Sequence, residues 1–327
     1  MATTITEPAP GPAGAPSGPA ADIAVVIPHY EDPDRLARCL DALAREDLGG
    51  AEVVVVDNAS PTAPPPDALK AAHPFARFVT EPVKGAAAAR NRGVAETAAP
   101  HLLFLDCDCV PRAGWLAAAR AARGAAPLVA GEVAVFDEGP GPRSGAEAFE
   151  TVFAFRVRDY VERQGFAVTA NLLAERAVFD AVGGFRGGVS EDVEWTRRAV
   201  AAGYPLAFRE DMAVGHPTRG DWPALEKKWR RMTDEMWGLR RETAGGAMGG
   251  AAAARLGWAA RALLMPPSVI AHLPRVLASD RLASRAERRR AAATLARLRL
   301  ARMRWMLRQA ASPAPSASPA PRPQRGG

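Results

Sequence analysis

The sequence predicts an α/β fold in which a Rossmann-like, mostly parallel sheet is flanked by helices and followed by a C-terminal helical extension. Short apolar runs alternate with helical patterns between residues 23 and 106, as in parallel sheets that are covered on both faces. The chain has 327 residues, 48% of them hydrophobic, so it can bury a sizeable core. Arginines gather near the C-terminus, and this distinguishes the extension from the body.

The elements of this sheet are predicted in order along the chain. Continuous apolar runs predict strands at residues 23–27, 53–56, 75–80 and 101–106. Helical spacing and start signals predict helices from Asp32-Pro33, near Leu69 and over residues 85–98. Ligands bind beyond the carboxyl ends of the strands in such sheets, so we expect a binding site at this edge.

Two carboxylates, Asp106 and Asp108, stand two residues apart where the fourth predicted strand ends. Side chains at i and i+2 of a strand point the same way, so both can face one ligand while Cys107 turns aside. Two hard oxygen donors suit a divalent cation, Mg2+ or Mn2+, that also holds a diphosphate. The alternative for an isolated Asp-x-Asp pattern is a solvated turn.

The chain is divided into four predicted segments. Residues 1–21 are rich in Ala, Pro and Gly without a basic start, which indicates a disordered leader rather than a signal peptide. A globular domain is expected over 22–243, a basic helical extension over 244–310 and a disordered Pro/Ser/Ala tail over 311–327. The three cysteines do not form a disulfide framework, so we expect a cytoplasmic protein.

The basic extension has two possible roles. From Arg255 onward fifteen basic residues accompany only two acidic ones, so the helices can lie on the inner face of the cell membrane as a peripheral contact. The alternative is packing on the globular domain with a solvated Arg face. No nucleic acid is expected as a partner, because no base-reading motif accompanies the charge.

Five ordered motifs resemble the signatures of family-two glycosyltransferases with the GT-A fold. They lie at residues 25–30, 55–60, 84–93, 105–108 and 191–195. The resemblance covers the chain from about Ile23 to about His216 and implies an inverting, metal-dependent enzyme. Such an enzyme moves a sugar from a nucleoside-diphosphate donor to a hydroxyl of an acceptor, here an unknown or lipid-linked glycan of the cell envelope.

The resemblance also implies the residues that bind the donor. Asp57 matches the acid that binds the nucleotide base, and Tyr30 matches an aromatic position near the base. The rivals are a turn cap for Asp57, core packing for Tyr30 and a solvated side chain for Arg90. The implied donor-binding set is Pro28, Tyr30, Glu31, Asp57, Lys84, Arg90 and Asp106.

The remaining implied roles concern the metal, the base and the acceptor. Asp108 matches the direct metal ligand, with Asp106 and His216 beside it. Asp192 matches the general base, and Glu191 and Trp195 are expected to contact the acceptor. Acidic residues also stabilise the first turn of a helix, with Ser190 as the cap here, and this is the alternative for the acids at 191 and 192.

A different function remains open at the level of the sequence. The Arg-rich helices could make the chain a nucleic-acid- or membrane-surface-binding protein, with a nucleotide-sugar-binding domain that does not catalyse. The absence of any of the four acids that the resemblance assigns to the donor, the metal and the base would favour this alternative. All four acids are present, at Asp57, Asp106, Asp108 and Asp192.

Overall fold

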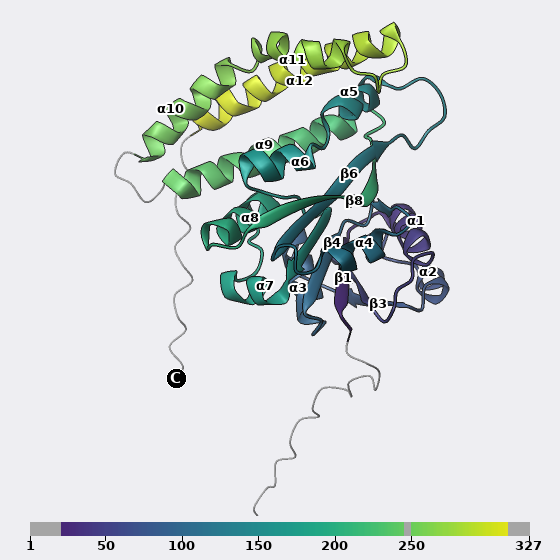
Figure 1. Cartoon of the computed structure of the whole chain (residues 1–327). Coiled ribbons are helices and arrows are strands. Elements are labelled where there is room, and N and C mark those ends of the chain that lie inside the picture. The colour runs from purple at the N-terminus through teal and green to yellow at the C-terminus, as the bar shows by residue number, and fades with distance from the viewer. Residues whose placement is uncertain (1–20, 245–249, 313–327) are drawn as a thin grey trace, which may run out of the picture.

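The computed structural model describes residues 21–244 and 250–312. Most of the predicted leader, 1–20, and most of the predicted tail, 313–327, lie outside these residues. The described chain forms an eight-stranded sheet in the order β3-β2-β1-β4-β7-β6-β8-β5, flanked by helices (Figure 1). The predicted α/β fold is therefore confirmed.

The first half of the sheet is parallel, as predicted. It comprises β1 (Ile23–His29), β2 (Glu52–Asp57), β3 (Ala76–Thr80) and β4 (His101–Leu105). The helices α1 (Pro33–Leu43), α2 (Asp67–Ala72) and α3 (Ala86–Ala95) connect these strands. The apolar runs of β1 and β2 are buried on both faces, which explains why they alternate so little with polar residues.

The second half of the sheet is mixed. β7 (Asn171–Glu175) pairs antiparallel with both β4 and β6 (Leu128–Phe136), whereas β6 runs parallel to β8 (Leu206–Pro217). β5 (Val110–Pro111) pairs antiparallel with β8. The helical elements around this half are α4 (Trp115–Ala122), α5 (Gly145–Phe153), α6 (Val157–Asp159), the π-helix η1 (Tyr160–Gln164), α7 (Arg176–Val182) and α8 (Glu191–Ala201).

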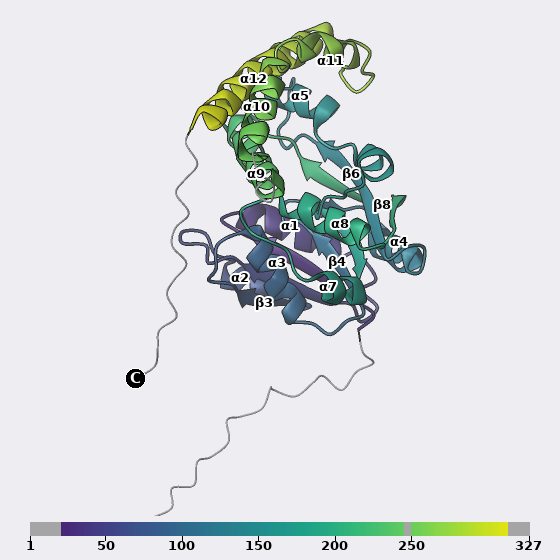
Figure 2. The ribbon, with the colours of Figure 1, turned by 90° about the vertical axis from the view of Figure 1, so that its left-hand side faces the viewer.

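Four C-terminal helices form a layer at one end of the sheet (Figures 1 and 2). They are α9 (Trp222–Ala244), α10 (Gly250–Leu263), α11 (Ser268–Leu277) and α12 (Arg285–Ala311). Leu225 of α9 and Leu295 of α12 pack against Phe149 of α5 in a second hydrophobic cluster. Within the described residues, no helix is both long enough and apolar enough to cross a membrane.

Candidate functional site

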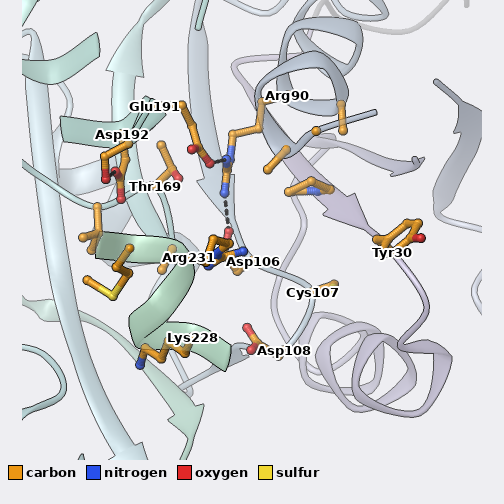
Figure 3. Close-up of a pocket in the computed structure, with 18 of the residues that line it drawn as sticks. Tyr30, Arg90, Asp106, Cys107, Asp108, Thr169, Glu191, Asp192, Lys228 and Arg231 are labelled. Atoms are coloured by element: carbon orange, nitrogen blue, oxygen red, sulfur yellow. Dashed lines mark hydrogen bonds and ion pairs between the residues drawn. The ribbon is translucent and has the colours of Figure 1, made fainter. Parts of the chain in front are cut away.

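A cavity of about 690 Å³ opens at the carboxyl ends of the parallel strands, between α3, α8 and α9 (Figure 3). Tyr30 and Asp192 lie on opposite sides of it, with Asp106 between them (Figure 3). The cavity collects nine of the predicted site residues: Pro28, Tyr30, Lys84, Arg90, Asp106, Asp108, Glu191, Asp192 and His216. Three others, Glu31, Asp57 and Trp195, are not among its lining residues.

Arg90 joins the two acidic parts of the cavity. Its guanidinium is 2.7 Å from Asp106 Oδ1 and 2.8 Å from Glu191 Oε1, and the residue is 4% exposed. Burial by itself would lower the pKa of Arg90, but Asp106 and Glu191 raise it above its ordinary value. Arg90 thus stays charged and fixes the end of β4 relative to the start of α8.

Asp106 and Asp108 lie in a turn rather than on a strand. β4 ends at Leu105, and the Cys109 N–H donates to the Asp106 carbonyl at 3.0 Å. The prediction that Cys107 turns aside is wrong, because Cys107 lines the cavity together with both aspartates. Burial, with Asp108 and Asp106 nearby, raises the pKa of the Cys107 thiol well above its usual range, so this sulfur is not a thiolate nucleophile.

Asp108 and His216 lie next to each other in the lining of the cavity. His216 Nε2 is 3.3 Å from Asp108 Oδ2, and the Arg219 guanidinium is 3.9 Å from the same oxygen. Burial, followed by the cations of Arg219 and Lys228, lowers the pKa of His216 to about 3. Burial also raises the pKa of Asp108.

This pair fits a divalent cation that is held partly by its substrate. His216 Nδ1 lies 2.8 Å from the Pro217 carbonyl oxygen, so the neutral ring donates there and turns the Nε2 lone pair toward Asp108. Among the residues that the structure describes, no three His, Cys, Asp or Glu side chains form a metal-binding group. Mg2+ commonly takes one or two protein ligands and completes its shell with phosphate oxygens and water.

Asp192 stands in the first turn of α8, at the opposite side of the cavity from Tyr30 (Figure 3). Burial, and then the charge of Glu191, raises the pKa of Asp192 to about 6. Its Oδ1 accepts a 2.7 Å hydrogen bond from the Val193 N–H. Ser190 occupies the N-cap position as predicted, but its hydroxyl makes no capping hydrogen bond.

The carboxylates of Asp57 and Glu31 form hydrogen bonds within the wall of the cavity and do not line it. Asp57 Oδ1 is 2.9 Å from His29 Nδ1 and accepts a 2.6 Å hydrogen bond from the Ser60 hydroxyl. The Glu31 carboxylate accepts hydrogen bonds from the Thr62 and Ala63 amides. The structure therefore does not bring these two predicted donor contacts into the cavity, because their oxygens are engaged in the loop after β2.

Near Tyr30, the cavity is lined by residues that are close to Asp57 and Glu31. Asn58 follows Asp57 and lines the cavity, and its Oδ1 accepts a 2.7 Å hydrogen bond from the Gly85 N–H. The Lys84 ammonium donates to the Ala59 carbonyl at 2.8 Å and lies 4.5 Å from the centre of the Tyr30 ring. Tyr30 is half-exposed, so the core-packing alternative for its ring does not apply.

Trp195 belongs to the core rather than to the predicted acceptor wall. It is fully buried, and its Nε1–H donates to the Gly183 carbonyl at 2.8 Å. Its ring packs against Phe179 and Phe185, with ring centres 5.9 and 5.0 Å away. Besides Tyr30, the aromatic side chains that line the cavity are Phe155, whose ring centre is 4.9 Å from that of His216, and Tyr160.

The contribution of α9 to the cavity is not predicted from the sequence. Lys228, Arg231, Met232 and Glu235 line the cavity, together with Arg219 just before the helix. The available signal was the four basic residues at 227–231, but Trp222, Leu225, Trp229 and Met232 stand among them at helical spacing, which favours core packing. The cavity gains three cations from this region, in addition to the carboxylates of Asp106, Asp108, Glu191 and Asp192.

Lys228 is held in place by a buried partner. Its ammonium is 2.5 Å from Glu150 Oε1, and the other oxygen of Glu150 accepts a 2.7 Å hydrogen bond from the Arg219 N–H. Glu150 is 2% exposed. Burial lowers the pKa of Lys228, and Glu150 opposes part of this effect. Glu150 thus positions two of the three cations.

The sequence and the structure were compared with known proteins. The model of the family described as Glycosyl transferase family 2 matches residues 24–194, which is more than half of the chain.

The chain belongs to glycosyltransferase family 2.

This glycosyltransferase is 29% identical over 217 residues to "Glycosyltransferase AglE" of Haloferax volcanii, a match that covers 64% of the chain and 71% of the relative. It is 30% identical over 234 residues to "Pre-mycofactocin glycosyltransferase" of Mycobacterium tuberculosis, covering 68% of the chain but 48% of that relative. Among solved structures, the mannosyltransferase PcManGT of Pyrobaculum calidifontis, in complex with GDP-Man and Mn2+, matches 86% of both chains with a TM-score of 0.55 and 17% identity. This last similarity concerns the fold.

Proposed function

We propose that the glycosyltransferase transfers a sugar from a nucleoside-diphosphate donor to an acceptor hydroxyl, with inversion and with the help of Mg2+ or Mn2+. One observation carries this proposal: Asp108, three cations and Asp192, with its pKa raised to about 6, line the same cavity. A diphosphate needs cations, and an attacking hydroxyl needs a base.

The donor is proposed to bind with its base at the Tyr30 end of the cavity. Tyr30 offers an exposed ring, and Pro28 and Asn58 line the same end. Asp57 then acts on this end through the His29 ring and the loop that carries Asn58, rather than by touching the base itself. The GDP-Man bound to PcManGT supports a nucleotide-sugar donor in this fold.

The diphosphate is proposed to lie between Asp108 and the cations of Arg219, Lys228 and Arg231. Asp108 and the neutral His216 would hold the divalent cation, which supplies a Lewis acid for the charge that builds on the leaving diphosphate. The Mn2+ of PcManGT supports a divalent cation in this fold. Asp106 stays paired with Arg90 at 2.7 Å, so we assign it to orienting the donor rather than to direct metal binding.

Asp192 is proposed as the general base. Its carboxylate accepts the proton of the acceptor hydroxyl while that oxygen forms a bond to the anomeric carbon. The bond from this carbon to the diphosphate oxygen breaks on the opposite face, so the configuration inverts. A pKa of about 6 leaves Asp192 mostly ionised at neutral pH and makes it a stronger base than an ordinary aspartate.

The acceptor is proposed to enter from a second cavity of about 580 Å³ that shares Lys84, Glu191, Arg231 and Glu235 with the first. Burial raises the pKa of Glu235 to about 7, partly opposed by Arg231. Carboxyl groups at this junction accept hydrogen bonds from sugar hydroxyls. We therefore assign Glu191 and Glu235 to the acceptor.

Two measurements test this function. Thermal unfolding with UDP-, GDP- and ADP-sugars, each with and without Mn2+, identifies the donor, because a ligand of the native state raises the Tm. We expect one nucleotide class to stabilise the protein, more strongly with Mn2+. NMR of the product then gives the anomeric configuration, and retention of the donor's configuration would refute the inverting mechanism.

A further inference from the structure

The helices α10, α11 and α12 carry most of the exposed large hydrophobic side chains. Nine such side chains are exposed in the described part of the chain, and six lie here: Leu256, Leu263, Leu264, Ile270, Leu277 and Leu300. Other residues of these helices, such as Trp258 and Leu295, fill the hydrophobic clusters below. The six exposed side chains are therefore not required to complete the core.

Seven exposed apolar residues recur at intervals of four and three residues from α10, through the turn, into α11. We call this set the outer stripe: Leu256, Ala260, Leu263, Pro267, Ile270, Pro274 and Leu277, all exposed and all apolar. This spacing keeps side chains on one face of a helix. The turn between the two helices retains helical hydrogen bonding, since the Ser268 N–H donates to the Leu264 carbonyl at 3.2 Å.

A surface helix of a soluble protein usually has polar residues on its solvent face. The outer stripe instead places apolar residues on the solvent face of α10 and α11. It extends to α11, which lies at the edge of the molecule far from β3 in both views (Figures 1 and 2). Exposed apolar side chains gathered in this way, with Arg261 and Arg275 exposed beside them, indicate a binding surface.

The neighbouring helix α12 exposes a row of arginines. Its exposed positions are Arg285, Arg289, Ala293, Arg297, Leu300, Arg304, Arg308 and Ala311. Residues 250–312 contain thirteen arginines and two acidic residues, and none of these arginines is ion-paired with an acidic residue that the structure describes. The described ion pair that reaches this segment uses Glu287 and joins it to Arg143 of the body.

The outer stripe and the arginine row meet in one hollow between α11 and α12. The hollow has a volume of about 720 Å³ and is lined by Leu277, Arg285, Arg288, Arg289 and Ala292. One apolar residue and three arginines thus line a common space, and the Arg288 guanidinium also donates to the Leu277 and Ser279 carbonyls. This combination suits a phosphate group attached to an apolar chain.

We propose that α10, α11 and α12 form a docking surface for a bilayer that contains anionic phospholipids. The outer stripe enters the boundary between headgroups and acyl chains, and the arginine row binds the headgroup phosphates. A second copy docked through the same face is a poor occupant, because it would place two arginine rows without acidic partners together. Nucleic acid would neutralise the arginines but leave the outer stripe in water.

Vesicle cosedimentation of the full chain tests this proposal and needs neither donor nor acceptor, so its outcome is independent of the proposed reaction. The vesicles contain phosphatidylcholine alone or mixed with phosphatidylglycerol. We expect binding to the mixed vesicles that weakens with salt. Ile270→Ser with Leu277→Ser should reduce binding more than about tenfold, and Arg285→Gln with Arg289→Gln about 25-fold, at roughly fivefold for each arginine.

Matched controls change the same residue types elsewhere. Val200→Ser, on α8, and Arg45→Gln, after α1, replace exposed side chains of the body and should leave vesicle binding unchanged. Equal binding to both vesicle types, or full binding by the Ser pair, overturns the proposal. So does a dimer in light scattering that the Ser pair dissociates, or retention on duplex DNA without vesicle binding.

Discussion

Replacing Asp192 with Asn should weaken catalysis and strengthen the fold at the same time. The amide keeps the size of the side chain, and its oxygen can still accept the hydrogen bond from the Val193 N–H. It cannot accept the proton of an attacking hydroxyl. Loss of a general base lowers kcat by roughly 10²- to 10⁴-fold, so we expect sugar transfer to fall by this amount while donor binding is kept.

The gain in stability follows from the raised pKa of Asp192. The pKa is 3.8 in the reference state and about 6 in the folded protein, so ionisation destabilises the folded state once the pH rises above about 4. Each unit of pKa corresponds to about 1.4 kcal/mol. The variant should therefore gain up to about 3 kcal/mol at pH 8 but only about 0.5 kcal/mol at pH 4.

Urea unfolding at pH 8 and pH 4, followed by tryptophan fluorescence, measures the gain. Asp180→Asn is the matched control, because Asp180 is an exposed aspartate on α7 and its replacement should change neither stability nor transfer. A gain for Asp192→Asn that is the same at both pH values would show that the carboxyl is not desolvated. A variant with near-normal turnover would show that Asp192 is not the base.

Three further predictions concern the same cavity. The kcat/KM of the wild type should fall tenfold per unit as the pH drops below about 6, because Asp192 (pKa about 6) then takes up a proton; a pH–rate profile measures this. Asp108→Ala should abolish the Mn2+-dependent part of the Tm shift with the donor, because the proposed metal ligand is lost. Glu150→Ala should lower the free energy of unfolding by about 3–5 kcal/mol, because Lys228 is left buried without its partner; urea unfolding measures the loss.

Each substitution has a control of the same type. Asp211→Ala removes an aspartate that pairs with Arg209 at the surface and should leave the metal response intact. Glu162→Ala removes a half-exposed partner of Arg158, and surface pairs contribute at most about 1 kcal/mol. If the Mn2+ response survives in Asp108→Ala, another group holds the metal. A loss near 1 kcal/mol in Glu150→Ala would mean that Lys228 finds another partner or stays hydrated.

The sequence predicted those site residues that lie next to the end of a strand or the start of a helix. Asp106 and Asp108 follow an apolar strand, and Asp192 opens a helix, so strand ends and helix starts brought them to one edge. Lys228 and Arg231 lie on a long helix much later in the chain. Their periodicity alone does not reveal which cavity the helix faces, because that depends on how α9 packs against α5 and the sheet.

The orientation of individual side chains was harder to predict than their position. Trp195 lies one turn beyond Asp192 on nearly the same face of α8, but the helix has already left the cavity there and packs against Phe179 and Phe185. Asp57 ends β2 as predicted, but its carboxylate forms hydrogen bonds with His29 and Ser60. Local pattern fixes the element, whereas the choice among nearby hydrogen-bond partners depends on tertiary packing.

Helix α9 connects the reaction site to the C-terminal layer. Lys228 and Arg231 on one side of it line the cavity, while Leu225 and Trp229 on another side pack into the cluster that holds α12. Arg302 of α12 also lies over the Trp229 ring, 4.8 Å from its centre. A tilt of α12 against the sheet would therefore shift the cations of the cavity. If the outer stripe docks on a bilayer, the packing of α9 would hold the proposed acceptor side of the cavity at a fixed height above that surface.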